Sequence, residues 1–335
     1  MSGSDKLRVG VVGGGYIGTT VGGQFERDPR STVTALTDLN AETRRTAGER
    51  LYVGEGSQYE DYESMLDAER LDAVLIGTPH TLHYEMVTAA LDRDLHVFCD
   101  KPLTTDLGHA RELTDRAEST DRVLMVGYQR HLNPAIQSAR ERWQGAADPD
   151  YLSAEITQNW ISRFEGTWRT DPDLSGGGNL YDTGSHLIDA VLWTTGLTPE
   201  SVSAEMVFAD DARRVDERAI LTIAFENGAH GTIAVHSDAP CVREHIHVWD
   251  DRGAVYLDGR QWEERDLERV EPDSTTVVPY VDREQRRTKA EAFIDSIETS
   301  ERPPATARDA LAVTALTEAA YESARIGERV SVDID

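Results

Sequence analysis

Three titratable side chains in the second half of the chain follow one another at helical spacing. Asp182, His186 and Asp189 come after a run of glycines, and at about 100° per residue they fall within a wedge of roughly 60° on a helix. A histidine with a carboxylate one turn away suits acid/base catalysis near neutral pH, because the carboxylate orients the imidazole and stabilises its protonated form. The alternative is an amphipathic helix whose polar face meets water. The glycines, Gly176 to Gly178, predict room for a ligand beside the backbone.

A lysine in the first half of the chain is the second candidate for chemistry. Thr78-Pro79-His80 and Asp100-Lys101-Pro102 each follow an apolar run, and in parallel sheets cofactor chemistry takes place at the carboxyl ends of the strands. Both prolines fix φ and withhold an N–H, so we expect them to form stiff walls beside the cofactor. Lys101 would then be placed to hydrogen-bond a substrate oxygen at this edge of the sheet. The alternative is a solvated loop lysine.

Residues 7–18 contain glycines in Gly-x-Gly-x-x-Gly spacing directly after an apolar run, in the order Gly13-Gly-Gly15-Tyr16-Ile17-Gly18. The pattern predicts a strand, a tight turn, close approach of the backbone to a pyrophosphate and a helix packed against the sheet. The N–H groups and the dipole at the start of that helix favour phosphate. We therefore expect a dinucleotide to be bound by Gly13, Gly15, Tyr16, Ile17 and Gly18.

Asp38 ends the next apolar run, twenty residues after the last glycine of that motif. A carboxylate at this position can accept hydrogen bonds from the ribose 2′-hydroxyl of NAD, and it repels the 2′-phosphate of NADP. NAD is therefore the expected cofactor, with NADP as the alternative.

Strand and helix patterns alternate over the first part of the chain. Strands are expected at 7–12, 33–38, 72–78, 96–99 and 123–127, with helices at 40–50, 62–69, 82–94 and 107–119. Such alternation is typical of parallel β-α-β units. The fold class is therefore predicted to be α/β, with a doubly wound Rossmann domain over residues 1–128 that binds the dinucleotide.

Closely spaced strand candidates replace this alternation after Pro134. They lie at 152–160, 201–208, 218–226, 232–237, 244–249 and 254–258, and helices are expected up to about 144, at 283–298 and at 306–325. Asn227-Gly228 suits a type I′ hairpin turn. We expect residues 129–335 to form an α+β domain with a mostly antiparallel open sheet, which binds the substrate and pairs subunits into a homodimer or homotetramer.

Acidic residues outnumber basic ones by 61 to 34 in this chain of 335 residues, which gives a net charge of −27. This charge would repel nucleic acid and anionic membranes, so neither is an expected partner. Only three of the basic residues are lysines, and acid-rich, lysine-poor surfaces resemble those of proteins from salt-loving organisms, where salt screens the self-repulsion. No apolar run is long enough to span a bilayer, the first residues are unlike a signal peptide, and the two cysteines are far apart. A cytoplasmic protein is expected.

Three histidines, His236, His245 and His247, fall on strand candidates in the second half. No carboxylate or cysteine completes a convincing ligand set around them. We therefore expect no metal site.

The motifs occur in the order typical of the Gfo/Idh/MocA oxidoreductases, which the chain resembles from residue 7 to its end. They are the glycine motif at 13–18, Lys101-Pro102, Gly127-Tyr-Gln-Arg130, Trp168-Arg169 and the segment 176–189. The chain departs from the family at Asp100, where glutamate is usual, at His80, where asparagine is common, and at His131, where an aromatic residue often stands. The family includes glucose-fructose oxidoreductase and inositol dehydrogenase.

In inositol-dehydrogenase-like members a lysine, an aspartate and a histidine form the catalytic group, and the matching positions here are Lys101, Asp182 and His186. The resemblance implies hydride transfer between nicotinamide and a carbinol carbon of a sugar, polyol or cyclitol. His186 would be the general base, Asp182 would orient it, and Lys101 would hydrogen-bond the substrate oxygen. Trp168 and Arg169 are expected at the substrate.

Three questions stay open at this point. Arg130 is placed at the substrate, although a role in capping the sixth strand is equally compatible with its position. Some relatives recycle tightly held NAD during elimination or glycoside cleavage, with no net redox change. The third alternative is a nucleotide-binding sensor without turnover.

Overall fold

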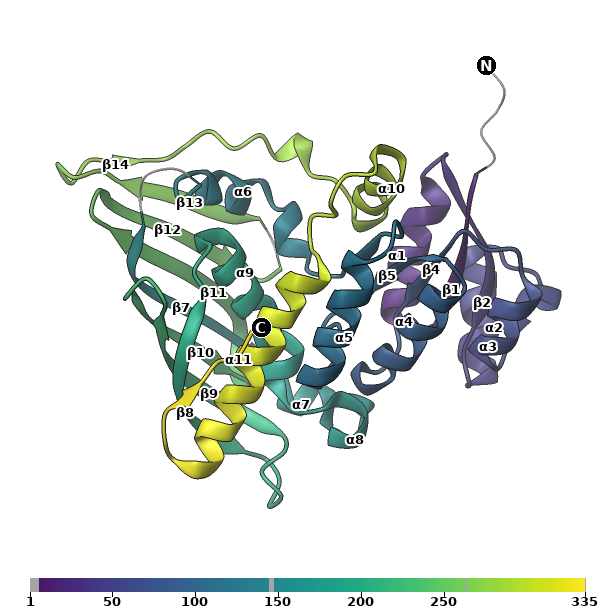
Figure 1. The fold of residues 1–335 in the computed structure, drawn as a ribbon, viewed down its shortest axis with the longest axis horizontal. Coiled ribbons are helices and arrows are strands. Elements are labelled where there is room, and N and C mark those ends of the chain that lie inside the picture. Colours follow the sequence, from purple (N-terminus) through teal and green to yellow (C-terminus); the bar gives the residue numbers. More distant parts are fainter. Residues whose placement is uncertain (1–5, 145–147, 263, 335) are drawn as a thin grey trace. The chain divides into compact units, whose positions relative to one another are not determined.

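The computed structural model describes residues 6–144, 148–262 and 264–334 (Figure 1). Contacts divide these residues into two compact units. The first unit comprises described residues of Met1–Thr104, Gly108–Gly127 and Arg287–Arg308, and the second comprises those of Thr105–Leu107, Tyr128–Arg286 and Asp309–Asp335. This division changes at Tyr128, close to the expected boundary, but it also assigns 287–308 to the first unit, where the sequence pattern had suggested the second.

The first unit is built on a six-stranded parallel sheet with the strand order β3-β2-β1-β4-β5-β6. The strands are β1 (Leu7–Val12), β2 (Ser31–Thr37), β3 (Gln58–Tyr59), β4 (Ala73–Ile76), β5 (His96–Cys99) and β6 (Leu124–Val126). The order reverses between β1 and β4, as in the doubly wound dinucleotide-binding fold, so the predicted fold class is confirmed. All four residues of β4 are buried, as expected for a strand covered on both faces.

Helices α1 (Tyr16–Arg27), α2 (Ala41–Leu51), α3 (Tyr62–Ala68), α4 (His83–Asp92), α5 (Leu107–Glu118) and α10 (Lys289–Thr299) accompany this sheet. Helix α10 comes from the far end of the sequence, and the ring of its Phe293 meets the rings of Phe25 and Phe98 edge to face at 5.9 and 6.0 Å. A capping box between Thr288 and Glu291 starts α10 at Lys289, six residues later than the pattern predicted.

The described residues of the second unit form a nine-stranded sheet with the order β14-β13-β12-β11-β7-β10-β9-β8-β15. The strands are β7 (Pro149–Asn159), β8 (Pro199–Phe208), β9 (Asp216–Phe225), β10 (His230–His236), β11 (Asp238–Asp250), β12 (Gly253–Arg260), β13 (Arg265–Val270), β14 (Thr276–Val277) and β15 (Val330–Ser331). Among the described strands of this sheet, only β7 and β10 pair in parallel. The mostly antiparallel sheet is therefore confirmed. Burial alternates along β9 and β10, so one face of the sheet is packed.

Helices α6 (Pro134–Glu141), α7 (Ile161–Phe164), α8 (Pro172–Ser175), α9 (Ser185–Thr195) and α11 (Ala307–Ile326) belong to the later part of the chain. Helix α9 contacts β7 and α6, and α6 also contacts β12 and β13. These contacts hold α9, which carries His186, against the sheet.

The turn at Asn227-Gly228 joins β9 to β10 as predicted, but its type is not I′. The φ angle is positive at Gly228 (87°) and not at Asn227, whereas a type I′ turn needs positive φ at both central residues. The Asn227 side chain accepts a hydrogen bond from the N–H of Ala229 at 3.0 Å instead. This local bond favours the ordinary right-handed conformation for the asparagine.

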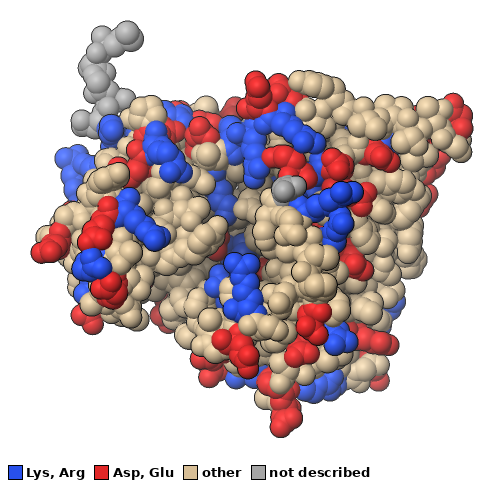
Figure 2. Space-filling model, turned by 180° about the vertical axis from the view of Figure 1, so that it is seen from behind, with Lys and Arg blue, Asp and Glu red and all other residues tan. Residues whose placement is uncertain are grey.

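Charged side chains of both signs are scattered among one another over the face drawn in Figure 2. Cys99 is buried and Cys241 is exposed. Among the helices within the described ranges, none combines the length and the apolar character needed to cross a bilayer.

Candidate functional site

The turn between β1 and α1 has the geometry that the glycine motif predicts. Gly13 has a φ of 93°, and a Cβ there would lie 2.8 Å from the backbone oxygen of Gly77. A Cβ on Gly18 would overlap the backbone oxygen of Gly13, so the helix approaches the turn as closely as glycine allows. A Cβ on Gly15 would meet nothing within 4 Å, and no side chain caps α1 there. The residues present thus fit a dinucleotide, with open space and free N–H groups at the helix N-terminus.

Asp38 stands beside this turn, at the end of β2. Its carboxylate accepts hydrogen bonds from the N–H of Gly14 and from the N–H of Asn40, both at 2.8 Å. The Arg44 guanidinium donates to the backbone oxygen of Asp38 at 2.5 Å. These bonds fix an anionic group next to the glycine turn, which is the arrangement suited to a ribose diol.

The two proline-containing loops follow β4 and β5, which are neighbours in the sheet. Thr78 and Pro79 are half-buried, Lys101 is 7% exposed, and the Lys101–Pro102 peptide is cis. The solvated-loop interpretation of Lys101 is therefore wrong, because the side chain is enclosed by the protein. Thr78, Pro79, Lys101 and Pro102 all belong to the first unit, as does the glycine turn.

His83 links these two loops, and sequence reasoning missed it. Its ring nitrogens lie 2.8 Å from the backbone oxygen of Pro102 and 3.0 Å from that of Thr78. The ring is fully buried, and this burial lowers the pKa of His83. No spacing rule predicts the link, since it depends on α4 packing beside both strand ends.

A second lysine accompanies Lys101. Lys289, at the start of α10, places its Nζ 3.7 Å from Oδ1 of Asp100. Burial lowers the pKa of Lys289, and the neighbouring Asp100 carboxylate opposes this effect. Two of the three lysines in the chain thus occupy this strand end. The rarity of lysine in this chain could have pointed to both residues as functional candidates, although Lys101 and Lys289 are 188 residues apart in the sequence.

In the second unit, Asp182 lies in a π-helical turn, Leu180–Gly184, directly before α9. Its Oδ2 accepts hydrogen bonds from Nε1 of Trp160 at 2.7 Å and from Nε of Arg169 at 3.1 Å. Trp160 is fully buried and Asp182 is 6% exposed. The carboxylate is therefore held by an indole and a guanidinium that come from the segment after β7.

His186 is in the first turn of α9 and is half-buried. Its ring meets the ring of Tyr128 edge to face, with 6.0 Å between the ring centres. The π-helical turn before α9 is typical of functional sites, because it shifts the side-chain register of a helix.

Asp189 differs from its prediction. Instead of facing water, its carboxylate lies 2.9 Å from Nε2 of His131, and both side chains are buried. The His131 ring in turn stacks on Trp193, with the centres 4.2 Å apart. Burial raises the pKa of Asp189. The interpretation of this helix as one with a solvated polar face is wrong as well.

The glycine run before this turn does not leave room for a ligand. A Cβ on Gly177 would meet the hydroxyl of Tyr321 at 2.6 Å, and one on Gly178 would overlap Asp216. The N–H of Gly178 donates to the Tyr321 hydroxyl at 2.9 Å, and that hydroxyl donates to Asp216. Asp216 also accepts from the N–H of Leu180 at 2.9 Å. The glycines therefore admit protein atoms, which fix the segment that carries Asp182.

Arg130 is buried in an ion-pair triad. Its Nε donates to Oε1 of Glu244 at 3.0 Å and its Nη2 donates to Oε2, while Nε of Arg265 donates to the same carboxylate at 2.9 Å. Although burial opposes ionisation, the two guanidinium groups lower the pKa of Glu244 to about 2. Glu244 on β11 and Arg265 on β13 were missed, because only the tertiary fold brings these strands to the short turn Gln129–Leu132 that carries Arg130. A substrate role for Arg130 stays a prediction.

Trp168 and Arg169 lie in a short turn, Trp168–Thr170, and both are half-buried. The Arg169 guanidinium sits over the rings of Trp168 and Phe164 at 4.5 and 4.6 Å. This stacking orients the guanidinium that binds Asp182.

Comparison with known families gives two matches in sequence order. Residues 7–128 match the model described as the oxidoreductase family with an NAD-binding Rossmann fold, and residues 147–256 match the Gfo/Idh/MocA C-terminal domain. The chain belongs to the Gfo/Idh/MocA family of oxidoreductases. Residues 7–128 of this family member are therefore an NAD(P)-binding domain.

Curated relatives include dehydrogenases of sugars and cyclitols. A D-xylose 1-dehydrogenase (NADP(+)) of Haloferax volcanii is 29% identical over 295 residues, which cover 84% of this chain and 86% of the relative. A myo-inositol 2-dehydrogenase of Thermotoga maritima is 26% identical, covering 75% of each chain. Among solved structures, levoglucosan dehydrogenase in complex with NADH and levoglucosan has a TM-score of 0.85 at 21% identity, covering 99% of this chain and all of that one. This last likeness concerns the fold.

Proposed function

We propose that this family member is an NAD-dependent dehydrogenase that transfers a hydride between nicotinamide and a carbinol carbon of a sugar, polyol or cyclitol. The observation that carries the proposal is Lys101, an enclosed cation at the carboxyl end of β5 in a unit that binds NAD(P). An ammonium at this place can hydrogen-bond an alcohol oxygen on which negative charge develops.

The histidine of the second unit supplies the other role. His186 accepts the hydroxyl proton as general base, and Asp182 serves as a positioning residue. Support comes from the two donors, Trp160 and Arg169, that hold the Asp182 carboxylate in the turn before α9. Bound nicotinamide supplies the hydride-accepting carbon. The proposal requires that Lys101 and His186 reach one bound alcohol during turnover.

A sugar, polyol or cyclitol is proposed as the substrate because of the side chains near Asp182. Trp168 offers an aromatic face and Arg169 a planar donor, and both suit a polyhydroxylated ring. Relatives named for D-xylose and myo-inositol support this class. Arg130 is proposed as a further substrate-binding residue.

NAD is proposed as the preferred form of the cofactor. The support is the Asp38 carboxylate, which two backbone N–H groups fix beside the glycine turn. The relative from Haloferax volcanii carries NADP(+) in its name, so the preference of this chain has to be measured.

A homodimer or homotetramer is proposed to form through the open face of the nine-stranded sheet. Tyr151, Val207 and Ile220, on three of its strands, are 45–56% exposed. Light scattering at high salt tests this, and a species of monomer mass at all concentrations would contradict it.

The deciding experiment is a spectrophotometric screen of aldoses, polyols and inositols with NAD and with NADP at high salt. Free NADH formed in proportion to the substrate supports the dehydrogenase. Product formation with no accumulation of NADH would identify the recycling chemistry of elimination or glycoside cleavage. Tight NAD binding without any product would identify a sensor.

A further inference from the structure

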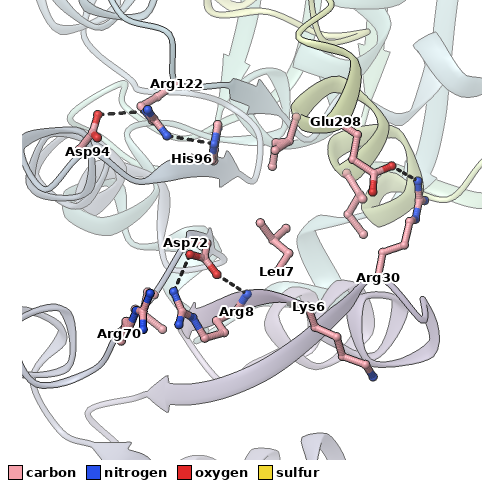
Figure 3. A pocket seen from close by; sticks show the side chains of 13 residues that line it. Lys6, Leu7, Arg8, Arg30, Arg70, Asp72, Asp94, His96, Arg122 and Glu298 are labelled. Carbon is pink, nitrogen blue, oxygen red and sulfur yellow. Dashed lines mark hydrogen bonds and ion pairs between the residues drawn. The ribbon is translucent and has the colours of Figure 1, made fainter. Parts of the chain in front are cut away.

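A pocket of about 440 Å³ lies in the first unit at the amino ends of the parallel strands (Figure 3). It is lined by residues at the start of β1, before β4 and at the start of β5, together with residues of α10. The dinucleotide-binding loops follow the carboxyl ends of the same strands. The pocket is therefore at the opposite edge of the sheet from the nucleotide.

The lining of this pocket is unusually basic for a chain with a net charge of −27. Five cationic and three anionic side chains line it. Each carboxylate is already engaged: Asp72 with Arg8 at 2.6 Å, Asp94 with Arg122 at 3.0 Å, and Glu298 with Arg30 at 2.8 Å.

Two further cations carry the excess charge. Lys6 and Arg70 are both exposed, and neither makes an ion pair with any described residue. In Figure 3 their side chains carry no dashed contact, in contrast to the arginines beside them. Their charge is available to an anion that enters the pocket.

His96, in the wall of the pocket, lies between two hydrogen-bond donors of the protein. The Nδ1 of His96 lies 3.0 Å from the N–H of Val123, and its Nε2 lies 3.3 Å from Nη1 of Arg122. Both of these neighbours are hydrogen-bond donors. A neutral imidazole can accept at only one nitrogen, so whichever nitrogen holds the proton faces another donor.

The imidazole is neutral near pH 7. Burial and the adjacent Arg122 lower the pKa of His96 to about 4, and the nearby carboxylates Asp94 and Asp72 oppose this shift. The contact of Nδ1 with Val123 is shorter than that of Nε2 with Arg122, so we assign Nδ1 as the acceptor. The proton of the neutral ring is then on Nε2. The Nε2–H and the Arg122 guanidinium then face one another as two donors in the pocket wall.

We propose that this pocket binds an oxyanion, as a phosphate group or as the carboxylates of a small polyacid. One anion oxygen accepts from both Nε2–H of His96 and the Arg122 guanidinium, which resolves the contact between the two donors. Arg70 and Lys6 neutralise the remaining charge. The site is independent of the hydride chemistry and uses no residue of the dinucleotide-binding turn.

Isothermal titration calorimetry of the full chain tests the site, with inorganic phosphate and citrate titrated separately at constant ionic strength set by KCl. Saturable binding of phosphate alone assigns a phosphate site, and saturable binding of citrate alone assigns a polycarboxylate site. Saturable binding of both anions assigns a site that accepts either oxyanion, and the absence of saturable heat with both would overturn the proposal.

Variants locate the binding. Arg122→Gln is expected to weaken the anion at least about tenfold, since it removes a charge-assisted hydrogen bond. Arg70→Gln removes an exposed, unpaired side chain, so it should weaken binding without affecting the fold. The matched control is Arg252→Gln, which deletes the same charge at an exposed turn between β11 and β12. Equal affinity in Arg70→Gln, Arg122→Gln and the control would overturn the site.

A spectroscopic measurement separates direct contact from a distant charge effect. Proton–nitrogen NMR of the histidine side chains should show a shift of the His96 Nε2 resonance that saturates with the same affinity as the calorimetric binding. An unmoved His96 resonance at saturating anion would contradict the proposed contact.

Discussion

The glycine turn of the first unit and the Asp182–His186 segment of the second both rely on glycine, for different reasons. Gly13 lets its backbone pack on that of Gly77, Gly18 packs on Gly13, and a Cβ on Gly15 would meet nothing within 4 Å. Gly177 and Gly178 instead admit Tyr321 and Asp216, which come from distant strands and helices. The same residue type therefore leaves open space in one region and makes a packing contact in the other.

The two regions also differ in how their charged groups are held. Asp38 is fixed by neighbouring backbone N–H groups, while Asp182, Asp189 and Glu244 are fixed by side chains from other elements. A local motif tolerates change elsewhere in the chain. A cluster assembled from several elements should respond to the loss of any one partner.

The largest expected effect tests whether the second region carries chemistry at all. His186→Ala should reduce the single-turnover rate of NAD reduction by about two to four orders of magnitude, because it removes the proposed general base. NAD affinity should stay unchanged. His230→Ala, an exposed histidine on β10, is the matched control. A wild-type rate in His186→Ala would remove the assignment.

The next effect concerns the stability of the assembled cluster. Glu244→Gln leaves the guanidinium groups of Arg130 and Arg265 buried without a counter-charge, so the free energy of unfolding should fall by about 3–5 kcal/mol. Chemical denaturation measures it. Glu42→Gln, in an exposed ion pair with Arg45 on α2, should leave the midpoint unchanged. Equal midpoints in the two variants would show that the triad is not stabilising.

The pH dependence of stability tests the contact between Asp216 and the glycine run. Burial raises the pKa of Asp216 to about 6, above its ordinary 3.8, so the folded state keeps a proton that the unfolded state loses between about pH 4 and pH 6. The free energy of unfolding should therefore fall as pH rises through this window, by on the order of 3 kcal/mol from this group. Asp216→Asn removes the titrating carboxyl, so the free energy of unfolding of this variant should change less between pH 4 and pH 6 than that of the wild type. An identical pH profile for wild type and variant would contradict the assignment.

The smallest effect concerns the local motif. Asp38→Ser removes the carboxylate beside the glycine turn, and the ratio of kcat/KM for NAD over NADP should fall about tenfold. Steady-state kinetics with both cofactors measure this ratio. The melting temperature serves as the control, because the serine hydroxyl can still accept from a backbone N–H. An unchanged ratio would show that Asp38 does not select the cofactor.

The strand predictions show where sequence patterns lose power. Strands with clear apolar runs, such as β1, β4 and β5, were located within a few residues. Strands β3, β14 and β15 have two residues each, too few for any period to register, and they exist because neighbouring strands pair with them. The assignment of 287–308 to the first unit depends on Phe293 packing on Phe25 and Phe98, which no local pattern encodes.

By itself the sequence determined the Rossmann sheet, the dinucleotide-binding turn, the antiparallel character of the second sheet and the candidate residues Lys101, Asp182 and His186. These follow from periodicity, glycine spacing and motif order, which are properties of short segments. Only the tertiary structure decided which partners the acidic residues of these segments take: Lys289 lies beside Asp100, Trp160 and Arg169 bind Asp182, and His131 contacts Asp189. Each partner lies on a different element, and burial makes such pairs necessary without fixing their spacing in the chain.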